Sequence, residues 1–142
     1  MDARRVISGT FGEVWLDDNK VAECYGLEAR VAVNREDIPL PRQMGMDSKI
    51  VSWQGTGTLR LYKVNTRIAQ AMEGVLKDGR DIRFTIISKL ADPDSFGSER
   101  VALKGVSFDE VVLANWEANT PQKDEIPFIF TDYEFLDEID PK

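Results

Sequence analysis

Apolar and polar residues alternate along residues 25–36 with a period of two, which is the side-chain period of a β-strand. The apolar positions are Tyr25, Leu27, Ala29, Val31 and Val33, and the polar positions are Glu28, Arg30, Asn34 and Glu36. Strand character begins at Lys20, and a strand over residues 20–36 would span about 55 Å, far more than a typical strand. We therefore expect that this segment bends at Gly26, divides into two strands, or extends beyond the body of its own domain.

Further segments of strand character are spread along the chain. They are residues 10–17, 50–63, 82–86, 100–104, 106–116 and 126–135. Asp18-Asn19 predicts a two-residue turn before the long strand, because both residue types tolerate a positive φ angle. Residues 38–49 and 92–97 predict loops, since both contain turn-forming residues and no clear period. Both faces of residues 126–135 are apolar, which predicts a strand that is buried on both sides.

One helix is predicted over residues 66–77. Its apolar residues, Ile68, Ala69, Met72, Val75 and Leu76, fall on one stripe, as in a helix that covers a core. Asn65 or Thr66 can cap its first N–H groups, and Gly79 is typical of the position just after a helix. We expect packing of the apolar stripe to stabilise this helix.

Six or seven strands and one helix indicate a mainly β (α+β) fold, an antiparallel β-sandwich or barrel with one flanking α-helix. The chain has 142 residues, the usual size of one domain, so we expect a single domain over residues 1–142. Gly55 and Gly57 lie inside a predicted strand and indicate a bulge or a close approach of another segment.

Two features of the composition exclude much active-site chemistry. The chain has no histidine, which excludes Ser-His-Asp and Cys-His nucleophilic sites, His-ligated metals and imidazole acid–base catalysis. Its one cysteine, Cys24, excludes an internal disulfide and fits a reducing compartment, and we expect it to be a small buried residue. The first residues do not resemble a secretory signal, and no apolar run reaches the length of a membrane span.

The net charge of −7 is concentrated near the end of the sequence. Residues 109–142 contain ten acidic and two basic residues. A surface of this sign would repel nucleic acid, because binding to phosphates needs Lys and Arg. The alternative interpretation is that these residues are solvated strand edges and a tail. Since the acidic segment contains Trp116, we expect this residue, Trp15 and Trp53 to be core or interface anchors rather than platforms for bases.

Candidate motifs for a metal or a cofactor all fail on spacing. Residues 92–97 resemble the start of a calcium loop, but Phe96 and Leu103 stand where oxygen ligands are needed. The adjacent carboxylates of Asp109 and Glu110 point to opposite faces of a strand and form no dyad. No glycine motif for phosphates or dinucleotides is complete. We therefore expect no catalytic residue, no cofactor and no metal.

Four long blocks carry a resemblance to a known family. They are ARRVISGTFGEVWLD (3–17), WQGTGTLRLYKVNTRI (53–68), RFTIISKLADPDSFGSERVALKGVSFDE (83–110) and PFIFTDYEFLDEI (127–139). In these blocks the chain resembles, nearly from end to end, the tail tube proteins of PBSX-like prophages and related contractile tails. The resemblance implies a β-barrel-like sandwich with a flanking helix, a fold shared with the tube protein of type VI secretion systems. It also implies hexameric rings that stack into a hollow tube inside a contractile sheath, and no catalysis.

The same resemblance implies the partners and the place of the protein. The partners are other copies of the chain and the tail sheath, tape measure, baseplate and tail terminator proteins, while DNA passes through the lumen without specific binding. The place is a virion tail or tail-like particle assembled in the cytoplasm of a bacterial host. A phage tail and a tail-like bacteriocin both stay open. The alternative function is a small-ligand-binding β-barrel module, and a histidine-free hydrolase is a third.

Open strand edges and projecting loops are candidate contacts between subunits, because a ring needs head-to-tail contacts between different surfaces. The candidate interface residues are Ile38, Leu40, Arg42, Met44, Met46, Asp92, Asp94, Phe96, Phe128 and Phe130. The candidate lumen residues are Glu28, Arg30 and Glu36. An acidic lumen would let DNA pass without binding.

Overall fold

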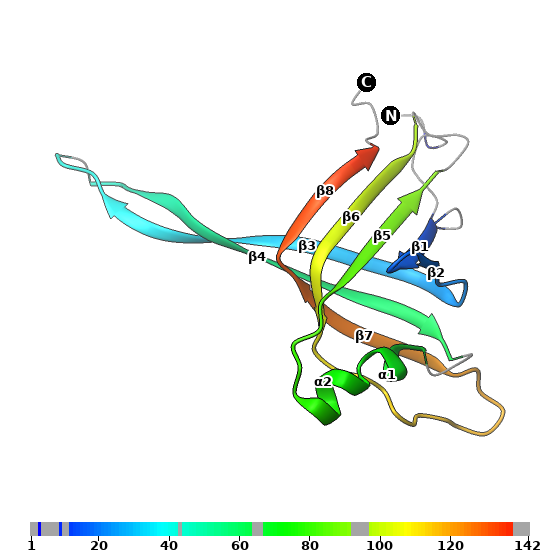
Figure 1. Cartoon of the computed structure of the whole chain (residues 1–142). Helices are drawn as coiled ribbons and strands as arrows, with labels where there is room; N and C mark the ends of the chain where they lie inside the picture. Colours follow the sequence, from blue (N-terminus) through cyan, green and yellow to red (C-terminus); the bar gives the residue numbers. More distant parts are fainter. Residues whose placement is uncertain are drawn as a thin grey trace.

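The computed structural model describes residues 3, 9, 12–42, 44–63, 67–91 and 97–137. Its strands are β1 (Gly12–Leu16), β2 (Asn19–Lys20), β3 (Cys24–Pro39), β4 (Met46–Tyr62), β5 (Phe84–Leu90), β6 (Glu99–Phe108), β7 (Lys123–Phe130) and β8 (Asp132–Asp137). Its helices are α1 (Arg67–Ala71) and α2 (Glu73–Asp78). The predicted fold class, mainly antiparallel β with one short helical segment, is confirmed (Figure 1).

All strands except β8 form one hydrogen-bonded path, from which β8 branches at β6, and the path folds into two layers (Figure 1). Sheet A has the order β2-β1-β5-β6-β8, and sheet B has the order β6-β7-β4-β3. β6 therefore belongs to both sheets. All these pairs are antiparallel, so the apolar faces of the two sheets can enclose one core.

β6 changes from one sheet to the other at Gly105. Phe84 pairs with Val106 and Ile86 with Leu103, so β6 contains one extra residue at this point. Gly105 has a φ angle of 65°, a left-handed conformation that glycine adopts without strain. This bulge lets the first part of β6 pair with β5 and β8, and its last two residues pair with β7.

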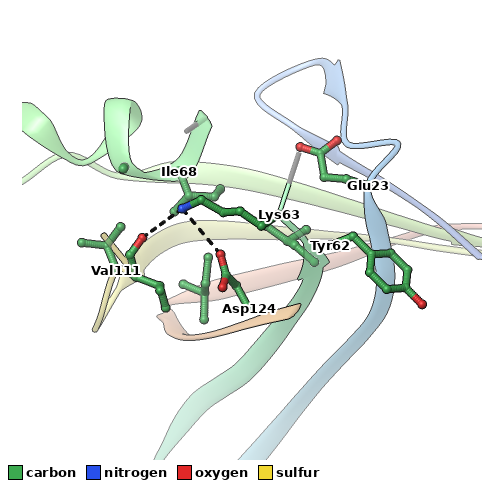
Figure 2. Close-up of a pocket in the computed structure, with 10 residues that line it drawn as sticks. Glu23, Tyr62, Lys63, Ile68, Val111 and Asp124 are labelled. Atoms are coloured by element: carbon green, nitrogen blue, oxygen red, sulfur yellow. Dashed lines mark hydrogen bonds and ion pairs between the residues drawn. The ribbon is translucent and has the colours of Figure 1, made fainter. Parts of the chain in front are cut away.

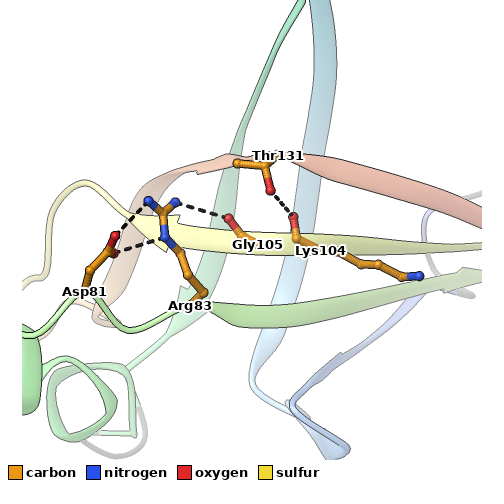
Figure 3. A network of polar contacts seen from close by, with 5 residues as sticks. All are labelled: Asp81, Arg83, Lys104, Gly105 and Thr131. Atoms are coloured by element: carbon orange, nitrogen blue, oxygen red, sulfur yellow. Dashed lines mark hydrogen bonds and ion pairs between the residues drawn. The ribbon is translucent and has the colours of Figure 1, made fainter.

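Thr131 fixes the second bend at the same corner, between β7 and β8 (Figure 3). Its backbone N–H donates to the Lys104 carbonyl at 3.1 Å, and its hydroxyl donates to the same oxygen at 3.5 Å. Arg83 donates to the Gly105 carbonyl at 3.4 Å and lies 3.0 Å from the Asp81 carboxylate. The bend within β6 and the bend between β7 and β8 are thus joined by hydrogen bonds.

The core lies between the two sheets and is closed at one end by the helices. Its buried apolar residues are Val14, Leu16, Val21, Leu59, Leu61, Ile68, Met72, Phe84, Ile86, Leu103, Val106, Phe108, Ile126, Phe128 and Phe130. Gly57 pairs with Phe128 and Gly55 with Phe130, and a side chain on either glycine would collide with the phenylalanine ring. The sequence predicted a bulge or a close approach here, and the structure has the close approach.

Residues 20–36 were expected to bend at Gly26, to divide into two strands or to extend beyond the body of the domain, and the structure shows all three. The chain breaks between β2 and β3, a register shift places an extra residue at Tyr25 beside Gly26, and β3 continues far out of the body with β4. The turn before it differs by one residue from the prediction. Asp17 and Asp18, rather than Asp18 and Asn19, have positive φ angles, 46° and 70°. Asp17 is fixed there because its carboxylate accepts a hydrogen bond from the Thr85 N–H at 2.8 Å.

The predicted helix is interrupted at Met72 and continues to Asp78, and Asn65 and Thr66 at its predicted start lie outside the described residues. Ile68 and Met72 are buried, but Leu76 is 57% exposed, so its place on the buried stripe was wrong. Gly79 ends α2 with a φ angle of 67°, as predicted. No helix among the described residues is long and apolar enough to cross a membrane.

Two further strand predictions were wrong. Residues 126–135 are not one strand, because Thr131 separates β7 in sheet B from β8 in sheet A. The second apolar face of this segment is correspondingly not buried, since Tyr133 and Phe135 are 44% and 46% exposed. Residues 109–116 are not a strand but belong to the loop between β6 and β7.

Candidate assembly interface

The β3–β4 hairpin is the candidate functional feature. β4 pairs with β7 only from Gly55 to Tyr62, whereas β3 and β4 pair with each other as far as Pro39 and Met46. Residues 32–54 therefore project from the body as a two-stranded ribbon (Figure 1). We call residues 32–54 the arm.

The arm exposes many large apolar side chains. They are Val33, Ile38, Leu40, Met44, Met46, Ile50, Val51 and Trp53, with exposed fractions from 36% at Leu40 to 104% at Met44. A two-stranded hairpin is at best marginally stable in water, and a monomeric protein rarely exposes so large an apolar surface. The arm has the properties of a surface that another chain covers.

The outer face of sheet B is polar, and its charges neutralise one another. Glu28 forms an ion pair with Arg30 and lies 3.6 Å from the Arg60 guanidinium. Arg60 also lies 3.5 Å from the Glu125 carboxylate. Two acidic and two basic side chains thus cross β3, β4 and β7 as one row. The polar face that the alternating sequence of β3 predicts therefore extends over β4 and β7.

Besides the two-residue β2, two strands have one edge that no other strand of the described chain pairs with. β3 pairs only with β4, and β8 pairs only with β6. Open edges present unpaired N–H and C=O groups and readily pair with another chain. With the arm, they are the candidate contacts for a ring.

The structure places the predicted interface residues that it describes in two different locations. Ile38, Leu40, Arg42, Met44 and Met46 lie together at the tip of the arm and are exposed. Phe128 and Phe130 lie in the core, with 1% and 4% of their surface exposed, so placing them at a surface between subunits was wrong. Asp92, Asp94 and Phe96 lie outside the described residues.

The predicted lumen residues do not all lie in one place. Glu28 and Arg30 share the charged row on sheet B. Glu36 is in the arm, opposite Lys49, beyond the register shift that follows the Asn34–Ser52 pair. It therefore does not join the row of Glu28 and Arg30.

A buried ion pair near the helices was not predicted. Asp124 is 5% exposed, lies 3.8 Å from the Lys63 ammonium and accepts a hydrogen bond from the Gln122 amide at 3.3 Å. Lys63 also donates to the Val112 carbonyl at 3.3 Å, next to a cavity of 20 Å³ (Figure 2). The sequence could have shown that Asp124 is buried. It lies two residues before Ile126 and four before Phe128, so its side chain points to the same core face of β7.

A cleft of 770 Å³ lies where β1 and β3 leave the sandwich open. Val14, Val21, Leu27 and Leu90 form its apolar lining beside Cys24. Cys24 is half-buried, and its thiol donates to the Gly26 carbonyl at 3.3 Å. Burial raises the pKa of this thiol, so it is a weak nucleophile at neutral pH.

Nothing in the described part of the chain forms a metal-binding cluster of three or more His, Cys, Asp or Glu residues. The acidic residues of the last quarter instead lie on several surfaces. Glu134 and Asp137 of β8 pair with Lys104 and Arg100 at 3.0 and 3.8 Å. Asp124 is buried, and the loop before β7 carries acidic residues without a basic one.

Comparisons with known proteins agree with these features. The family model described as phage tail tube protein matches residues 1–137. The phage-like element PBSX protein XkdM of Bacillus subtilis (strain 168) is 30% identical over 141 residues, which are 98% of this chain and 96% of that protein.

Solved structures share the fold. A chain of the sheath–tube complex of an extracellular contractile injection system, PVC, in its extended state superimposes with a TM-score of 0.73 at 10% identity, covering 91% of this chain and 90% of that one. A chain of the tube-terminating cap of the anti-feeding prophage gives a TM-score of 0.69 at 11% identity, covering 95% and 93%. A Bacillus subtilis protein with 32% identity gives a TM-score of 0.52 and is covered to 96%, against 92% of this chain. On the family match and the full-length similarity to XkdM, the chain belongs to the phage tail tube protein family.

Proposed function

We propose that this chain is the structural subunit of the inner tube of a contractile phage tail or tail-like particle, and that its copies form hexameric rings that stack. The observation that carries the proposal is the arm, whose strands pair only with each other and expose eight large apolar side chains. Family membership and the shared fold of tube proteins support it. A structural role needs no catalysis, and we propose none.

In this proposal the open edge of β3 joins a strand edge of the next copy around the ring. Edge pairing across six copies would close the wall and leave no unpaired edge, as in a barrel. The arm then continues past the ring and contacts a neighbouring copy through Ile38, Leu40, Arg42, Met44 and Met46. Such contacts join different surfaces of two copies, so they can close a ring or extend a stack.

The polar outer face of sheet B is the surface that we assign to the lumen. On this assignment Glu28 and Arg30 line the lumen together with Arg60 and Glu125, and the four charges cancel. The wall is then neutral rather than acidic. DNA can still pass without binding, because a balanced surface releases no net counterions from the phosphates.

The full particle supplies the other partners in this proposal. Sheath, baseplate, terminator and tape measure proteins contact the tube, and the particle is assembled in the bacterial cytoplasm. Similarity to a chain of the PVC sheath–tube complex supports tail partners in general. Asp92, Asp94 and Phe96, in the sequence between β5 and β6, remain candidate contacts.

Electron microscopy of the purified chain tests the proposal. We expect rings or tubes in negative stain and in sedimentation as the protein concentration rises. A variant with residues 37–48 replaced by Asn-Gly keeps the Glu36–Lys49 pair beside a favourable two-residue turn, so it should fold but remain monomeric. Leu76→Gln, an exposed apolar position outside the arm, is the control and should assemble normally.

Two results would contradict the proposal. One is a wild-type chain that stays monomeric at every concentration and binds a small molecule in the 770 Å³ cleft, as the alternative ligand-binding module would. The other is assembly of the shortened-arm variant at the wild-type concentration.

A further inference from the structure

We propose that Trp116 and the acidic loop that carries it dock into a groove on the outer face of sheet A of a second copy of this chain. The loop consists of residues 109–122, between β6 and β7. The groove is lined by Trp15, Asp18, Ile87, Lys89 and Arg100. This inference rests on the proposed function, because it names one of the contacts between subunits of the tube.

The loop is fastened at both ends. The Asp109 N–H donates to the Pro127 carbonyl at 2.9 Å, and the Lys63 ammonium donates to the Val112 carbonyl at 3.3 Å. At the other end, the Lys63 N–H donates to the Gln122 carbonyl at 2.9 Å. A loop of this length without strand or helix usually has a function. Its fixed base means that binding has less chain to order, which favours affinity.

Between these anchors the loop exposes apolar side chains close to acidic residues. Trp116 is 82% exposed and Leu113 is 73% exposed. The loop contains Asp109, Glu110 and Glu117 and no basic residue. Tryptophan contributes strongly to interfaces when it enters an apolar pocket. The matching surface must therefore be an apolar pocket with a basic rim.

The groove on sheet A provides this chemistry in a volume of 360 Å³. Trp15 and Ile87 are cross-strand partners on β1 and β5, and they form an apolar floor. Lys89 is two residues after Ile87 on the same face and pairs across the ladder with Arg100. Against these two basic residues the groove has one acidic residue, Asp18.

Lys89 is the cation that the loop can reach without breaking an existing pair. Arg100 already lies 3.8 Å from the Asp137 carboxylate. Lys89 makes no ion pair within the described residues. Glu117, next to Trp116 in the chain, carries the opposite charge and would meet Lys89 as Trp116 enters the groove.

The occupant is a second copy because the loop and the groove do not meet within one chain. The loop lies beside the helices, whereas the groove is on the strands of sheet A, and Trp116 is almost fully exposed (Figure 1). Both complementary surfaces are present on every copy. Since they differ, their contact is heterologous and can close a ring or extend a stack. The acidic loop disfavours a nucleic acid in the role of partner.

A charge swap tests the contact in the full-length chain. Glu117→Lys and Lys89→Glu should each raise the concentration needed for assembly at least tenfold, as measured by sedimentation and negative-stain microscopy. The double variant should recover most of this loss, because the two charges are exchanged but still opposite. Trp116→Ala should raise the concentration as strongly as either charge variant. Glu73→Lys, the same charge change on exposed α2, should have no effect.

The outcomes separate this inference from the proposed function. Wild-type protein that never assembles contradicts the proposed function. Rings or tubes of wild-type protein together with normal assembly of Glu117→Lys, Lys89→Glu and Trp116→Ala overturn the inference alone. Failure of the double variant to recover, with unchanged thermal melting, also overturns the contact between Glu117 and Lys89.

Discussion

Gly105 is the residue at which β6 passes from one sheet to the other. Replacing it by alanine should destabilise the fold, because the left-handed backbone costs a side chain about 1–2 kcal/mol. The new methyl group would also collide with Thr131, which adds about 1–3 kcal/mol of overpacking. We expect the urea midpoint of Gly105→Ala to fall by the equivalent of at least about 2 kcal/mol.

Gly45 provides the control for this change. An added side chain there meets nothing within 4 Å, and its φ angle is not in the left-handed region. Gly45→Ala should leave the urea midpoint unchanged. Equal midpoints for the two alanine variants would show that the corner at Gly105 tolerates a side chain.

The buried ion pair of Lys63 and Asp124 also contributes to stability. Lys63→Met would leave the Asp124 carboxylate buried without its cation, and we expect a loss of about 3 kcal/mol in the free energy of unfolding. The double variant Lys63→Met/Asp124→Leu should lose less than Lys63→Met, because no charge stays buried. The free energies of unfolding of both variants and of Asp124→Leu, measured by urea denaturation, complete a double-mutant cycle. A double variant less stable than Lys63→Met would contradict the buried-charge explanation.

At the scale of elements, the helical segment separates two residues that the sequence placed on one stripe. Met72 is 4% exposed and Leu76 is 57% exposed. Met72→Gln should therefore reduce the free energy of unfolding by about 2–4 kcal/mol, because it buries an amide in the core. Leu76→Gln should change it by less than about 0.5 kcal/mol. Thermal melting of the pair checks this, and equal losses would mean that both residues pack against the core.

The helical segment also illustrates the limit of a periodic pattern. Five apolar residues at helical spacing predicted one continuous buried stripe, but the helix is interrupted at Met72 before α2 begins. Beyond this interruption Val75 still packs against the core, whereas Leu76 is exposed. The position of the break depends on how the segment fits over the two sheets, which the helical period does not contain.

For the whole molecule, the charge distribution predicts no affinity for DNA. The net charge is −7, and the row of Glu28, Arg30, Arg60 and Glu125 is balanced. We expect no gel shift of double-stranded DNA by the assembled or the monomeric protein at physiological salt, up to high micromolar concentration. A shift at low micromolar concentration would contradict passage of DNA through a passive lumen.

The sequence by itself determined the class of fold and the elements. Alternation with a period of two identified most of the strands, Gly79 marked the end of the helix, and Gly55 and Gly57 predicted either a bulge or the close approach that the structure has. These properties are local, because side-chain period and backbone conformation depend on residues close together in the chain. Similarity of long sequence blocks identified the family for the same reason, since such blocks hold the spacing of many elements at once.

Only the tertiary structure decided which surfaces are free. Phe128 and Tyr133 are both aromatic residues of the predicted strand over residues 126–135, yet the first is 1% exposed and the second 44% exposed, because the bend at Thr131 sends β7 and β8 into different sheets. In the same way, the arm is exposed because β7 ends where Gly55 pairs with Phe130. Burial depends on which segments distant in the sequence lie alongside, so the candidate interface could be seen only after the strands had been paired.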